Sequence, residues 1–142
     1  MRYHVKNLIN KGWVYEEREV RDVQNTTTLL ARITIAKIVD EQRLVDIIRT
    51  APVIRGDANW RCRTWVAEVL SRLAEDGAAV GSAAELNWEK IESVAREYVG
   101  RKTVEGRYER GSDQAQADVG HASRARDGVL ILAGTQRCVV LA

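Results

Sequence analysis

Residues 59–75 read NWRCRTWVAEVLSRLAE, and their apolar side chains recur every three or four positions. That period is typical of an amphipathic α-helix with one buried face. We expect a helix from about Asn59 to Glu75 that ends before Gly77, because glycine commonly follows the last turn of a helix. The stripe that this helix has to bury consists of Cys62, Val66, Val69, Leu70 and Leu73.

The N-terminal part of the chain contains three stretches with the pattern of β-strands. Residues 3–8 and 13–19 alternate well enough for strands, and the turn-forming segment 10–12 lies between them. This arrangement predicts a β-hairpin. Residues 29–39 are rich in β-branched side chains, which favours a longer third strand.

Two further helices are expected, one on each side of the helix at 59–75. Asp40 would cap a helix over residues 41–50, which Pro52 would end. Another helix spans residues 87–104 and would turn inward Trp88, Ile91, Val94, Ala95 and Tyr98. The order of three strands followed by three helices predicts an α+β fold, in which helices pack on an antiparallel sheet.

The C-terminal part has a different composition. Small and polar residues dominate from residue 106 to residue 128, and no period persists there. We therefore expect a single α+β domain over residues 1–105 and a low-complexity linker with a poorly structured tail over residues 106–142. The short apolar runs 129–133 and 139–141 would form at most an edge strand.

Composition argues against several classes of protein. The 142 residues carry 22 basic and 20 acidic side chains, a net charge of +2, which is too balanced to indicate a nucleic-acid-binding tail. No apolar run approaches the roughly 20 residues of a membrane helix, so we expect no membrane partner. Cys62 and Cys138 are too few for a disulfide framework or a zinc site. We expect a soluble cytoplasmic protein that uses no metal and no cofactor.

Cys62 is the strongest candidate for a catalytic residue, because it lies in the first turn of the strongest predicted helix. Unpaired N–H groups and the positive end of the helix dipole favour a thiolate there, and the same N–H groups would hold an oxyanion. Arg61 and Arg63 add positive charge, and Trp60 and Trp65 would form the wall of a substrate pocket. The alternative is that Cys62 is a small buried residue of the core.

His4 is the expected base for this thiol. The other histidine, His121, lies in the low-complexity tail, whereas a strand would hold the imidazole of His4 in place. A two-residue turn at residues 10–11 would set Glu17 opposite His4, close enough to orient the ring. A three-residue loop would instead make Glu16 the nearer neighbour. The alternative is a half-exposed strand histidine with solvated glutamates beside it.

A histidine on an early strand, followed by a cysteine that opens a later helix, resembles the circularly permuted papain-like enzymes. In lecithin retinol acyltransferase and its relatives the cysteine is followed by an aromatic and an apolar residue, and His4, Cys62, Trp65 and Val66 match that order. Arg61 replaces the asparagine that precedes the cysteine in that family. The resemblance implies a papain-like fold and a thiol enzyme that transfers acyl groups.

A second resemblance, to small uncharacterised ascomycete proteins, covers residues 3–104. Those proteins share three strand motifs, Tyr-His-Ala-Lys, Trp-Val-Tyr/Phe-Glu-Glu and Leu-Val-Arg-Ile, which correspond here to residues 3–6, 13–17 and 30–33. They also share two helix motifs, Trp-Xaa-Cys-Xaa-Xaa-Trp-Val and Tyr-Val-Xaa-Arg-Lys, which correspond to residues 60–66 and 98–102. A further strand precedes the histidine in that family. Its absence would leave the hairpin and His4 beside a gap, with an exposed edge that promotes self-association. A relation to fungal arginine-containing cyclodipeptide synthases would imply aminoacyl-tRNA as a substrate and a role in secondary metabolism.

Two functions stay open at this point. The first is cysteine-dependent acyl transfer, or amide or ester hydrolysis, in which Cys62 attacks, His4 carries the proton and Glu17 orients His4. Its substrate would be a small acyl donor or an aminoacyl-tRNA. The second is a non-catalytic structural or interaction domain in which Cys62 is buried. A distance of about 4 Å between the thiol and an imidazole nitrogen would favour the first.

Overall fold

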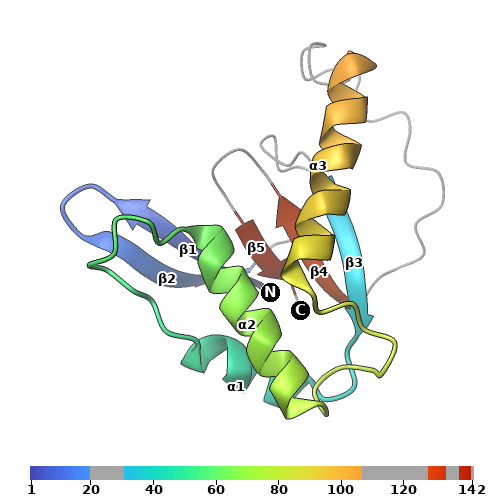
Figure 1. The fold of residues 1–142 in the computed structure, drawn as a ribbon. Helices are drawn as coiled ribbons and strands as arrows, with labels where there is room; N and C mark the ends of the chain where they lie inside the picture. The colour runs from blue at the N-terminus through green and yellow to red at the C-terminus, as the bar shows by residue number, and fades with distance from the viewer. Residues whose placement is uncertain (20–30, 107–127, 134–137, 142) are drawn as a thin grey trace.

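The computed structural model describes residues 1–19, 31–106, 128–133 and 138–141. Its elements, in chain order, are β1 (Arg2–Leu8), β2 (Gly12–Arg18), β3 (Ala31–Lys37), α1 (Glu41–Thr50), α2 (Cys62–Asp76), α3 (Trp88–Val104), β4 (Gly128–Ala133) and β5 (Cys138–Leu141). The strands form one sheet in the order β2-β1-β5-β4-β3, and all neighbours in it are antiparallel. The helices cover one face of this sheet (Figure 1). The prediction of an α+β fold with helices on an antiparallel sheet is confirmed.

The two C-terminal strands occupy the centre of the sheet. β5 pairs with β1 on one side and with β4 on the other, and β4 pairs in turn with β3. The expectation of an edge strand at residues 129–141 is therefore wrong. A physical reason is visible in the sequence GVLILA of β4, which contains none of the charged or proline residues that protect natural edge strands. The expectation that residues 107–127, which include His121, form a low-complexity linker concerns a segment outside the described residues.

β1 is an interior strand, because β2 and β5 flank it. The expectation that His4 lies beside a gap in the sheet is therefore wrong. The outer strands of the described sheet are β2 and β3. The edge of β3 is covered, since the N–H groups of Gly81 and Glu85 donate to the carbonyls of Lys37 and Ile35. Among the described segments, β2 pairs with β1 alone.

A three-residue loop connects β1 to β2, in place of the expected two-residue turn. Leu8 pairs with Gly12, and the N–H of Lys11 donates to the carbonyl of Leu8 at 3.1 Å. Asn10 and Gly12 have positive φ angles of 69° and 67°, a conformation that glycine and asparagine tolerate better than most residues. The additional loop residue shifts the pairing by one position, and such a shift exchanges the two faces of β2.

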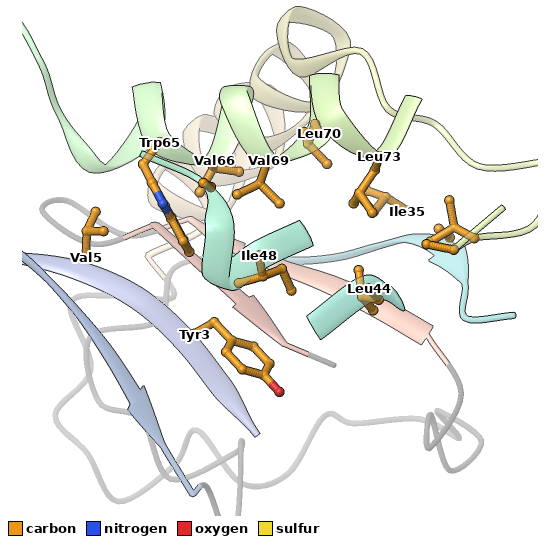
Figure 2. Packing of buried hydrophobic residues seen from close by; sticks show 14 of the residues in the cluster. Tyr3, Val5, Ile35, Leu44, Ile48, Trp65, Val66, Val69, Leu70 and Leu73 are labelled. Carbon is orange, nitrogen blue, oxygen red and sulfur yellow. The ribbon is translucent and has the colours of Figure 1, made fainter. Parts of the chain in front are cut away.

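The stripe of α2 packs into the core as the period of its sequence predicts. Val66, Val69, Leu70 and Leu73 are at most 1% exposed, and burial of each such side chain stabilises the fold by about 1.5–3 kcal/mol. Figure 2 shows these residues in one cluster with side chains of β1, β3 and α1. Gly77 ends the helix in the left-handed conformation, with φ 67°.

α2 begins at Cys62, three residues later than expected. The preceding segment forms a turn of its own, in which the Asp57 carboxylate accepts from the N–H of Asn59 and the Asp57 carbonyl accepts from the N–H of Trp60. Arg61 then takes the N-cap position. Cys62 is therefore the first residue of the helix, and the prediction that it lies in the first turn is confirmed.

The other two helices begin at the expected caps. The side chains of Asp40 and Asn87 accept from backbone N–H groups at the start of α1 and α3. In α3, Ile91 and Ala95 are buried, as expected, whereas Val94 is 56% exposed. Trp88 is partly buried against the core and Tyr98 is partly buried, so Val94 is the one residue expected to face inward that is exposed.

Candidate functional site

The side chains of β1 alternate between the two faces of the sheet. Tyr3 and Val5 belong to the core cluster, and Figure 2 shows them on the side of the sheet that carries the helices. His4 lies between them and therefore faces the opposite side. There its Nε2 lies 2.9 Å from Oε2 of Glu16, and Nζ of Lys6 lies 2.6 Å from Oε1 of the same carboxylate.

Cys62 lies on the helix side of the sheet. It is 8% exposed and belongs to the same core cluster as Trp60 and Trp65, and α2 packs over β1 and β5. The sheet thus stands between Cys62 and the face that carries His4, an arrangement that does not favour the expected pairing of the two side chains. The reason is the two-residue period of a strand, since a histidine between two core residues faces away from the core. The apolar neighbours of His4 are the sequence signal that predicts this face.

Glu17, which was expected to orient His4, lies on the helix face of β2 with other partners. Arg49 of α1 donates from Nε and Nη2 to its two oxygens at 2.8 and 2.9 Å, and the hydroxyl of Tyr15 donates to Oε1 at 3.0 Å. The hydrogen bond from Arg49 lowers the pKa of Glu17, whereas burial and the hydrogen bond to Glu17 raise the pKa of Tyr15. Glu17 therefore ties β2 to α1.

Glu16 takes the place opposite His4 that the two-residue turn would have given to Glu17. The hydrogen bond from Lys6 is the main cause that lowers the pKa of Glu16, so this group is a carboxylate shared by an ammonium and an imidazole. Such a pair orients an imidazole ring. Nucleophilic catalysis would also require a nucleophile beside His4, and β1 and β2 contain no Ser, Thr or Cys.

The two arginines beside Cys62 make local contacts. Nη1 of Arg61 donates to the carbonyls of Ala58 and Trp60 at 2.6 and 2.8 Å, which stabilises the turn before α2. Arg63 lies 3.8 Å from a carboxylate oxygen of Glu92 in α3. Both side chains therefore have partners within the protein. That Arg61 and Arg63 bind a substrate stays a prediction.

The two tryptophans beside Cys62 are core residues. The ring of Trp60 stands edge-on to the ring of Trp13, with centroids 5.2 Å apart, and the ring of Trp65 lies 5.8 Å from that of Tyr15. Trp60 is 5% exposed and Trp65 is fully buried. Trp60 therefore joins the segment before α2 to β2, and Trp65 joins α2 to β2, so neither ring lines an open surface.

Several charged side chains on the described helices are paired with one another. Ion pairs join Arg72 to Glu68 within α2 and Arg96 to Glu92 within α3. Within the described ranges, no group of three His, Cys, Asp or Glu side chains could hold a metal ion. None of the helices described in the structure has the length and apolar character needed to cross a bilayer.

Comparison with known proteins identifies a family and no activity. A family model that is described as a family of unknown function (DUF6914) matches residues 1–121 of the 142. No curated protein matches the chain. No solved structure matches it either.

Proposed function

The chain belongs to the DUF6914 family of unknown function, and we propose that it is a non-catalytic interaction domain in which Cys62 is a core residue. The observation that carries this proposal is that His4 and Cys62 lie on opposite faces of the sheet. A thiol needs its base within hydrogen-bond reach, or one water away. A sheet between the two side chains disfavours both arrangements, which supports the proposal.

The edge of β2 is the surface that we propose for association with a second copy of the chain. Among the described strands β2 pairs with β1 alone, so one row of its N–H and C=O groups faces outward. In a two-fold arrangement centred on Glu17, Glu16 of each copy would lie opposite Arg18 of the other. Such opposite-charge pairs contribute about 0.2–1 kcal/mol each. The two Glu17 side chains would meet at the centre, each already paired with Arg49.

Sedimentation velocity over a range of protein concentrations tests this surface. We expect a dimer that dissociates more readily in Arg18→Glu, because that change replaces both opposite-charge pairs by like charges. Lys37→Glu is the matched control, since Lys37 is an exposed residue on the opposite edge strand. A native chain that stays monomeric at every concentration, or equal effects of the two variants, would refute the proposed surface.

Alkylation by iodoacetamide, followed peptide by peptide in a mass spectrometer, tests the position of Cys62. A thiol in the core reacts slowly in the folded protein and quickly in urea, whereas an accessible thiolate reacts quickly near neutral pH. Peptide analysis separates Cys62 from Cys138, and Cys62→Ala provides the blank. Fast reaction of Cys62 in the folded chain would contradict its assignment to the core.

Cysteine-dependent acyl transfer is the second candidate function, and one observation favours it. α2 begins at Cys62 and carries no acidic residue in its first turn, so its N–H groups would stabilise a thiolate. The thiolate would attack the acyl carbonyl, form a thioester and release the alcohol, which for an aminoacyl-tRNA is a ribose hydroxyl. Intact-mass measurement after incubation with aminoacyl-tRNA or simple esters tests this step. We expect no adduct, and an adduct that Cys62→Ala abolishes would favour the enzyme over the interaction domain.

A further inference from the structure

Three of the large hydrophobic side chains that the described chain exposes lie in or beside two loops. Ile9, in the β1–β2 loop, is 92% exposed, Leu8 beside it is 36% exposed, and Ile54, in the loop between α1 and α2, is 43% exposed. Figure 1 shows both loops extending to the same end of the molecule, and the ring contact between Trp13 and Trp60 joins them. We define the hairpin-end surface as Leu8, Ile9, Lys11, Ile54 and Arg55.

The two loops and their flanking residues carry an excess of basic side chains. Residues 6–12 and 53–63 contain five basic side chains and one acidic side chain, that of Asp57. Lys6 and Arg63 are paired with Glu16 and Glu92, so the local charge is +2 when these two carboxylates are counted. Lys11 and Arg55 are exposed, and no described acidic side chain forms an ion pair with either of them.

We propose that the hairpin-end surface binds the surface of an anionic lipid bilayer. Apolar side chains at a loop tip enter the boundary between headgroups and acyl chains, and neighbouring Lys and Arg side chains attract anionic headgroups. RNA would use the same positive charges, but it would not bury Ile9 or Ile54. Its bases would stack on aromatic rings, and those of Trp13 and Trp60 are packed against each other. The proposal goes beyond the interaction domain proposed above, because it needs neither the β2 edge nor Cys62.

Co-sedimentation of the full chain with vesicles tests this inference. We expect binding to vesicles of phosphatidylcholine and phosphatidylserine, and much weaker binding to vesicles of phosphatidylcholine alone. Lys11→Gln and Arg55→Gln should each lower the affinity about fivefold, and Ile9→Asp should lower it at least about tenfold. Val104→Asp is the matched control for Ile9, because Val104 is 90% exposed on α3, and Lys37→Gln is the control for the charges. Both controls should bind as the native chain does.

Equal binding by the native chain and Ile9→Asp would overturn the proposal, and so would an equal loss in Val104→Asp. Competition with tRNA tests whether the hairpin-end surface binds nucleic acid rather than anionic lipid. If tRNA binds more tightly than the anionic vesicles, and Lys11→Gln weakens it while Ile9→Asp does not, the surface is a nucleic-acid site and the lipid assignment is wrong. Arg18→Glu, which is directed at the β2 edge, should bind vesicles normally, so failure of self-association and failure of lipid binding are distinguishable.

Discussion

Replacing Trp65 by phenylalanine tests whether the buried indole N–H of this core residue lacks a hydrogen-bond partner. Trp65 is fully buried, and no described residue accepts a hydrogen bond from its Nε1. The smaller ring leaves a gap of roughly 40 Å³, which costs about 1 kcal/mol, and the lost apolar burial costs about 1 kcal/mol more. A buried donor without a partner costs about 1–3 kcal/mol, so its removal offsets most of that loss. We therefore expect the free energy of unfolding to change by less than about 1 kcal/mol.

Urea denaturation followed by far-UV circular dichroism measures this change without relying on tryptophan fluorescence. Trp60→Phe is the matched control, because Trp60 belongs to the same cluster and its indole N–H is not left buried without a partner. That control should lose about 2 kcal/mol, and Trp65→Ala should lose about 3–5 kcal/mol. If Trp65→Phe loses as much as Trp60→Phe, the indole N–H of Trp65 is satisfied and the reasoning is refuted.

Leu73→Ala should lower the free energy of unfolding by about 2–5 kcal/mol in urea and Val94→Ala by less than about 0.5 kcal/mol, because Leu73 is buried and Val94 is exposed; equal effects would contradict the face assigned to α3. Gly77→Ala should cost about 1 kcal/mol in the same titration, because the left-handed conformation of this cap strains a residue with a Cβ, and a neutral result would argue against that conformation. The hydrogen bond from Arg43 is the main cause that lowers the pKa of Asp76. The stability that this carboxylate supplies is therefore present above its unfolded-state pKa of about 3.9 and is lost as the pH falls through its folded-state pKa. Asp76→Asn should therefore lower the Tm in calorimetry at neutral pH and make no difference in strong acid; a difference that does not depend on pH would count against the ion pair.

The sequence by itself determined the helices and the location of the hairpin. The stripe of α2 ending at Leu73, the cap at Gly77 and the caps at Asp40 and Asn87 all follow from residues within one or two turns of each other. These signals are local, because a helix satisfies its backbone from residues four positions away and a cap from residues three positions away. The side of the sheet to which His4 points was also present in the sequence, as a histidine between the apolar residues Tyr3 and Val5.

The length of the β1–β2 loop was decided by the tertiary structure. Asn10 and Gly12 both admit positive φ angles, so the local sequence accommodates a turn of two residues or of three. The burial of Tyr15 against Trp65 selects the longer loop, because the shorter one would exchange the faces of β2. That choice is what places Glu16, rather than Glu17, opposite His4.

The partners of the C-terminal strands were likewise decided only by the tertiary structure. Arg2 of β1 pairs with Leu141 of β5, and no local pattern encodes a contact between the two ends of a chain. A strand pattern specifies which faces are apolar, whereas its neighbours in the sheet depend on which other strands complete the same core. The separation of Cys62 from His4 has the same origin. The sequence places Cys62 on a helix and His4 on a strand. The packing of α2 on one face of the sheet is what puts the sheet between the two side chains.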